Sequence, residues 1–163
     1  MALLKLGEQP IQSLQDDTAS AKLSRTLFDT VIDSLVALHP WHFATAEIKL
    51  QKNTDGHFIV PTNVLRILKT SGHIIGNKIY SDEDGITIFA IVRTVPDLFP
   101  SYFISLAATR LAMEFCVPLT GDQTLFRTLV SLYETELQTA KFIDSTTAQS
   151  SVIKDFSLIS TRF

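Results

Sequence analysis

The stretch Ala37-Leu-His-Pro-Trp-His-Phe-Ala-Thr45 marks the place where the chain changes from a helical to a strand pattern. It holds the only tryptophan, two of the four histidines, and a proline that disfavours a helical conformation at His39. Before it, apolar residues recur at helical intervals, and after it they alternate with charged residues, as in a half-buried strand. We therefore expect a helix–sheet junction at His39, Pro40, Trp41 and Phe43, with Pro40 and Trp41 fixing the angle between the two elements.

Three segments have apolar residues at the intervals of an amphipathic helix. The first covers about residues 18–39 and ends at the junction. The second covers about residues 101–117 and is expected to stop at Pro118, and the third covers about residues 122–148. These segments predict three main helices that form a helical core.

The segment between the first two helices, about residues 43–95, has the pattern of short strands separated by turn signals. Asn53-Thr-Asp-Gly56 is such a signal, and it predicts that residues 57–60 return along residues 46–50 as a hairpin. The whole segment is expected to form an inserted antiparallel β meander. The predicted fold class is therefore α+β, with the β-rich insertion carried by the helical core.

The two ends of the chain lie outside this pattern. Residues 1–17 lack sustained periodicity, and we expect an extended N-terminal arm before a main domain of residues 18–148. Residues 149–163 are expected to form an extended C-terminal arm, which begins with the polar linker Gln149-Ser-Ser151. The apolar residues of this arm are Val152, Ile153, Phe156, Leu158, Ile159 and Phe163. Such a cluster fits either a terminal strand or coil packed on its own domain, or an arm that docks on another subunit or partner.

Composition limits what the protein can be. Its 163 residues are 45% hydrophobic and 19% charged, which is enough to bury a core in one domain. The formal net charge of -3 argues against a surface that grips nucleic acid all around, because such a surface needs clustered Lys and Arg. The single cysteine, Cys116, excludes an intramolecular disulfide bond and a multi-cysteine zinc site.

The histidines His39 and His42 are the first candidates for metal chemistry, because they are three residues apart. Pro40 lies between them, however, and no Cys, Asp or Glu follows at ligand spacing. The chain also has no G-x-S-x-G motif, no phosphate-binding glycine loop and no catalytic cysteine signature. We therefore expect a polar junction around Trp41, and no catalytic residue, cofactor or metal.

Three consecutive carboxylates, Asp82, Glu83 and Asp84, precede Gly85. The run lacks the spaced acidic residues and the late bidentate Glu of a calcium loop. It predicts a solvated hairpin tip.

Four segments, taken in their order and spacing, resemble the head-to-tail adaptor family of tailed bacteriophages, also called tail tubular protein A. They are Ala37-Leu-His-Pro-Trp-His-Phe-Ala-Thr45, Pro61-Thr-Asn-Val-Leu-Arg66, Val92-Arg-Thr-Val-Pro-Asp-Leu-Phe99 and Pro118-Leu-Thr-Gly-Asp122. The likeness runs from about Leu27 to Ser145. The chain departs from the family at His42, where relatives usually carry Asn, and at Asn63, where they usually carry Asp.

This resemblance implies a structural protein without catalysis. Members of the family form a ring, typically twelve-fold, below the portal at the capsid vertex, and they bridge portal and tail around the channel through which DNA leaves. The implied partners are other copies of the chain, the portal protein and a downstream tail or nozzle protein, with no membrane and no sequence-specific contact to DNA. The implied location is the virion, after assembly in the cytoplasm of the bacterial host.

By analogy with the family, the apolar C-terminal arm anchors on the portal. In such a ring the acidic hairpin tip at residues 82–84 can line the lumen and keep DNA from sticking. Two other interpretations stay open. One is another phage or prophage protein for tail completion or the capsid, and the other is an uncharacterised enzyme or metal protein.

Overall fold

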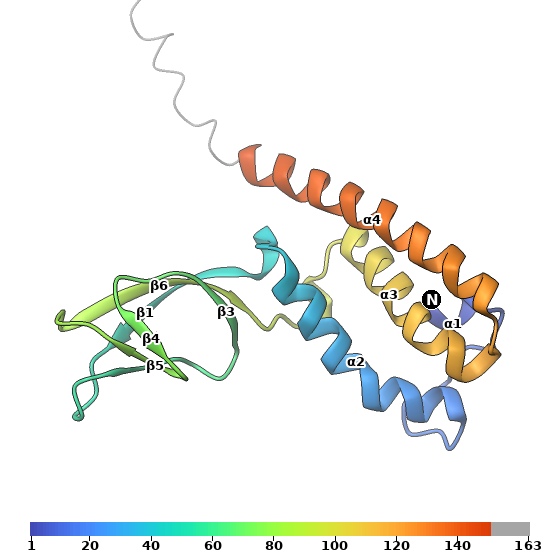
Figure 1. The fold of residues 1–163 in the computed structure, drawn as a ribbon, viewed down its shortest axis with the longest axis horizontal. Coiled ribbons are helices and arrows are strands. Elements are labelled where there is room, and N and C mark those ends of the chain that lie inside the picture. The colour runs from blue at the N-terminus through green and yellow to red at the C-terminus, as the bar shows by residue number, and fades with distance from the viewer. Residues whose placement is uncertain (151–163) are drawn as a thin grey trace, which may run out of the picture.

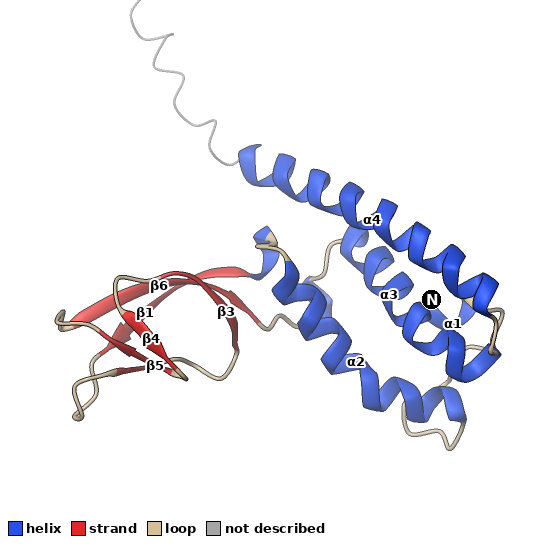
Figure 2. Cartoon of the chain, in the orientation of Figure 1, coloured by secondary structure: helices blue, strands red, loops and turns tan. Residues whose placement is uncertain are grey.

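The computed structural model describes residues 1–150. Figure 1 shows a helical part and a β part side by side. Figure 2 shows that the long helices all lie in the helical part and the strands all lie in the β part. The helices are α1 (Ala2–Lys5), α2 (Ala19–Leu38), α3 (Ser101–Thr120) and α4 (Gln123–Ser150), with the short 3-10 helices η1 (His42–Ala44) and η2 (Pro96–Leu98). The strands are β1 (Thr45–Gln51), β2 (Phe58–Ile59), β3 (Val64–Lys69), β4 (His73–Ile75), β5 (Lys78–Tyr80) and β6 (Gly85–Val92). The predicted α+β class is confirmed.

The helix α3 is the centre of the helical part, and α1, α2 and α4 all pack against it. Its fully buried residues include Phe103, Leu106, Ala112 and Cys116. Within residues 1–150, α3 is the one helix long and apolar enough to cross a membrane, judged by length and composition alone. Its place among the other helices accounts for that composition, because a core helix is apolar on most sides.

The helix α3 continues past Pro118, where the sequence predicted its end. Proline in the last turn removes one N–H donor, but the turn before it is already formed. The helix instead ends at Gly121, which has a left-handed backbone (φ 66°) and donates its N–H to Val117 O at 3.1 Å. Asp122 then caps α4, because its Oδ1 accepts from the backbone N–H of Thr124 and of Leu125.

Residues 1–17, predicted as an extended arm, lie against the helical part. The one-turn helix α1 packs on α3, and Leu3 and Leu6 are buried in the main core. Lys5 Nζ also lies 3.3 Å from Glu136 Oε1 on α4. The apolar residues of this segment are too few to show a period, so the sequence could not reveal this packing.

The strands form two three-stranded antiparallel sheets rather than one sequential meander. The strand order is β1-β6-β3 in the first sheet and β2-β5-β4 in the second. The predicted hairpin of residues 46–50 with 57–60 is wrong, because β1 pairs with β6 along its whole length, from Thr45 opposite Ile91 to Gln51 opposite Gly85. The two-residue strand β2 could satisfy only a fraction of the backbone groups of β1, whereas β6 matches all seven of its residues.

The β part has a small core of its own between the two sheets. Phe58 and Ile79 come from the second sheet, and Ile86, Ile88 and Ala90 come from β6 of the first. The alternation of buried and exposed residues along β6 places these β6 side chains on one face. The β part therefore has a hydrophobic centre separate from that of the helices.

Candidate functional site at the helix–sheet junction

Trp41 lies at the point where the helical part meets the β part. Its side chain is fully buried, and its Nε1–H donates to Leu35 O at 3.1 Å in the last turn of α2. Its ring packs edge-on against Phe103 of α3 and against His39, with ring centroids 5.3 Å and 4.7 Å apart. The helical and β parts thus meet around Trp41, after Pro40 and after His39, whose backbone is extended.

Phe43 extends this aromatic cluster along η1. Its ring lies 4.9 Å from that of Phe103 and 5.8 Å from that of Phe99, in both cases edge to face. Edge-to-face ring pairs add to the stability that burial alone provides. The junction residues of the sequence are therefore in contact with the start of α3 as well as with α2.

Asp144 of α4 is the centre of the polar side of the junction. Its carboxylate is 2% exposed and accepts from the backbone N–H of His42 at 3.2 and 3.1 Å and from Tyr102 Oη at 2.7 Å. The Nδ1 atom of His42 is 2.7 Å from Asp144 Oδ1, and Nε2 of His39 is 3.8 Å from Asp144 Oδ2. These contacts hold the last turns of α4 on the turn between α2 and β1.

The pKa values at the junction follow from burial. Desolvation lowers the pKa of His39, and the nearby cations Lys141 and Arg66 lower it further, whereas Asp144 opposes them. Desolvation and the hydrogen bond to Asp144 raise the pKa of Tyr102 far above its ordinary value. Tyr102 therefore keeps its proton and donates it in a hydrogen bond to Asp144, and burial favours the neutral form of His39.

Asp144 was not found by sequence reasoning, although a signal was present. The buried face of α4 includes Leu129 and Ala140, and the next position of that face, four residues on, holds an aspartate. A carboxylate on an apolar stripe indicates a buried partner, because an unpaired buried charge is costly. Its partners His42 and Tyr102 lie 102 and 42 positions earlier in the chain, so the sequence could not name them.

A second connection between the two parts is formed by Arg93, the residue after β6. Its guanidinium binds the carboxylate of Asp33 on α2, with Nε at 3.0 Å from Oδ1 and 3.1 Å from Oδ2. Its backbone N–H donates to Asn63 O at 2.7 Å. Arg93 therefore joins α2, β6 and the start of β3, and it lies in the open, where Asp33 raises its pKa.

The arrangement is suited to holding elements together. No group of three or more His, Cys, Asp and Glu side chains that could hold a metal ion occurs within residues 1–150. The buried carboxylate of Asp144 is in contact with the backbone N–H and Nδ1 of His42 and accepts a hydrogen bond from Tyr102 Oη. The junction thus acts as a clamp, which we define as the contacts of Asp144 that hold α4 on the turn between α2 and β1.

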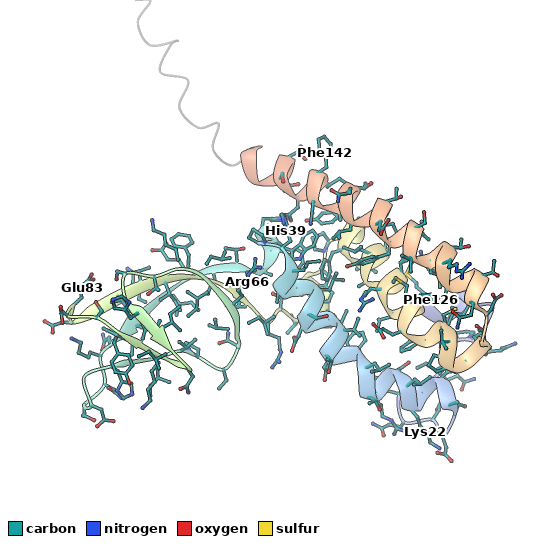
Figure 3. All side chains as sticks on the ribbon, in the orientation of Figure 1. Lys22, His39, Arg66, Glu83, Phe126 and Phe142 are labelled. Carbon is teal, nitrogen blue, oxygen red and sulfur yellow. The ribbon has the colours of Figure 1, made fainter. Side chains whose placement is uncertain are left out.

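The other two candidate sites lie elsewhere. Asp82, Glu83 and Asp84 are exposed on the β5–β6 connection, and Figure 3 shows Glu83 at the end of the β part farthest from the helices. The expected docking arm lies outside the described residues except for its first two positions, which end α4. Its apolar residues Val152, Ile153, Phe156, Leu158, Ile159 and Phe163 therefore have no structural account.

The fold and the junction define an α+β protein whose helical and β parts are joined by a buried clamp. A comparison with protein-family models finds a match over residues 1–141 to the family described as tail tubular protein. The chain belongs to the tail tubular protein family. No curated protein matches it. The family makes the chain a structural component of a bacteriophage tail, with its place in the virion.

Proposed function

We propose that the chain is the subunit of a head–tail connector ring that docks beneath the portal, links it to the tail or nozzle protein and surrounds the DNA exit channel. By analogy with the head-to-tail adaptor family, the ring holds twelve copies and forms in the host cytoplasm. Its role is structural, without catalysis, cofactor or metal. DNA passes through its lumen without sequence-specific contact.

The observation that carries this proposal is the clamped joint between the two parts. A subunit that bridges two large assemblies has to hold its two ends at a fixed angle. Here Trp41 is fully buried at the joint, and Asp144 of α4 binds the same turn. Arg93, which follows the last strand of the β insertion, binds Asp33 of α2. The joint is therefore supported at separate points, as a bridging subunit requires.

The ends of the subunit have matching roles in the proposal. The apolar segment of residues 152–163 follows α4 and anchors on the portal. The acidic tip at residues 82–84 faces the lumen, where its carboxylates repel the phosphates of passing DNA.

Sedimentation velocity of the purified chain, alone and mixed with the portal ring of the same genome, tests the ring. We expect a slowly sedimenting species alone, and a stoichiometric complex of many copies per portal ring in the mixture. No association with an intact portal would instead favour another tail-completion or capsid-accessory role.

Deletion of residues 152–163 tests the arm. We expect docking to the portal to be lost while the thermal midpoint of the remaining chain stays unchanged. A sharper comparison replaces Phe156 and Phe163 by Ser in one variant, and Lys154 and Arg162 by Ser in a control. Loss of docking in the first variant alone supports an apolar anchor, and unchanged docking of the deletion refutes it.

A further inference from the structure

The helices α2 and α4 lie on different sides of α3, so each has an outward face that α3 does not cover. The contacts between elements join α3 to α2 and α3 to α4. Figure 1 shows that α2 and α4 run in the same direction, from the side of α1 towards the β part. Two outward faces on one subunit are what a ring needs, because a head-to-tail ring contact joins two different surfaces of the same chain.

The outward face of α4 can be buried in an interface at a low desolvation cost. It is formed by exposed residues at helical spacing, namely Thr124, Thr128, Ser131, Thr135, Gln138, Thr139 and Phe142. The hydroxyl groups of Thr128, Thr135 and Thr139 donate to carbonyls one turn earlier in α4, at 3.1, 3.1 and 2.9 Å. Their hydrogen-bond donors are thus already satisfied, and the cost of burying the face is reduced.

Phe142 stands out on this face because its side chain is 70% exposed, and Figure 3 shows it pointing away from the helical part. An exposed phenylalanine at the C-terminal end of a weakly polar helix face is a typical interface anchor.

The side of α2 carries a trough that can receive such an anchor. Two adjoining hollows, about 380 and 390 Å³ in volume, share the side chains of Phe28 and Ile32. The first is almost wholly apolar, and Leu14 and Ile104 of α3 are among its lining residues. The second is bordered by Asp29, Asp33, Arg93 and Val95.

Charges on the two faces match when the helices are parallel. Along the edge of the α4 face, Arg127, Glu134 and Lys141 follow one another at intervals of seven residues, with signs plus, minus, plus. On α2, Asp29 borders the second hollow, and Lys22, whose Nζ lies 2.6 Å from Asp17 Oδ1, precedes it, so the signs along this helix are plus, minus. Lys22 and Asp29 are also seven residues apart, which is about 10.5 Å along a helix. Asp29 and Lys141 make no ion pair within the described part of the chain.

We propose that α4 of one copy packs in parallel against the α2 trough of the next copy. With Lys141 beside Asp29, Phe142 comes to the point where Phe28 and Ile32 join the two hollows. Rotation about an axis along the helices keeps α4 of one copy parallel to α2 of the next, as in the single chain. The proposal rests on the ring function above and identifies the contact between neighbours: a second copy of this chain, seated through α4.

Charge reversal tests the contact. Asp29→Lys and Lys141→Asp each place like charges together, so each should raise the concentration for half-maximal filling of the portal ring at least about tenfold. The double variant carries both changes on every copy and should recover most of the loss. Asp55→Lys is the control, because Asp55 is an exposed turn residue of the β part, and it should fill the ring as the unmodified chain does.

Phe142→Ser provides an independent readout. It should block ring filling with no loss of thermal stability in the isolated chain, because the side chain is mostly exposed. Mass photometry of copies per portal ring measures every variant.

The outcomes separate the contact from the ring function. Normal filling by Phe142→Ser and by both single charge reversals overturns the contact and leaves the connector role intact. If the unmodified chain does not join the portal, the connector role fails, and the contact is then judged by sedimentation of the concentrated chain alone. Self-association that Phe142→Ser removes supports the contact, and the absence of self-association overturns it.

Discussion

Trp41 combines two roles at the junction, since it both packs and donates a hydrogen bond. Its ring fills the space between α2, η1 and α3, and its indole N–H donates to the carbonyl of Leu35 in the last turn of α2. The packing and the hydrogen bond both depend on the backbone direction that Pro40 imposes on His39. One side chain thus fixes where the helix ends and how the chain leaves it.

Replacement of Trp41 by Ala should lower the free energy of unfolding by about 3–5 kcal/mol, because it leaves a large cavity among the aromatic rings. Urea denaturation measures the change. Trp41→Phe is the comparison variant, since it keeps one aromatic ring in the core but loses the N–H donor and part of the packing, at a smaller cost of about 1–3 kcal/mol. A loss below about 1 kcal/mol for the Ala variant would contradict the buried position.

His39 should make the protein less stable as the medium becomes acidic. Burial holds its pKa in the folded state below the ordinary 6.5, so between these two values the unfolded chain binds more protons than the folded one. The stability linked to neutral His39 is therefore present above pH 6.5 and is lost as the pH falls below it. His39→Gln should show a smaller loss of unfolding free energy between pH 7.5 and pH 5 than the unmodified chain. A larger loss in the variant would mean that Asp144, which faces His39 from α4, outweighs burial and the cations Lys141 and Arg66.

At the scale of elements, the sequence predicted the helices well and the strand partners poorly. Helical periodicity is local, so α2, α3 and α4 could be located from the spacing of their own apolar residues. Strand pairing depends on residues far apart, and β1 pairs with β6 across a separation that no turn signal encodes. The turn at Asn53–Gly56 does exist, but the chain uses it to pass from the first sheet to the second.

Gly121 controls the sharp turn between α3 and α4. Its φ of 66° is unfavourable for residues with a Cβ atom, while the space around that position is empty. Gly121→Ala should therefore cost about 1–2 kcal/mol of stability through backbone strain alone. Thermal unfolding checks this, with Gly121→Asn as the comparison that recovers part of the loss, because Asn tolerates this conformation. Equal stability of the Ala variant and the unmodified chain would show that the turn can adopt another backbone.

At the scale of the whole molecule, the junction could be located from the sequence but its construction could not. The local pattern change around Trp41 is visible in a single chain. The clamp needs Asp144, whose partners His42 and Tyr102 come from two other segments. Contacts of this kind depend on how α4 lies over α3, and no sequence period specifies that angle. The same holds for α1, which only the assembled helical part can bury.

The pairing of β1 with β6 has a consequence for how the chain can vary. Thr45 and Ile91 are opposite partners on neighbouring strands, so the chain leaves the helical part and re-enters it at adjacent points. With respect to the helices, the whole β part is therefore a loop whose two ends lie next to each other. The entropic cost of bringing the ends of such a loop together grows only slowly with its length. The β part is therefore an exchangeable cassette: insertions, deletions or replacements between these two points should leave the helical scaffold folded as long as they keep the contacts of β3 with α2.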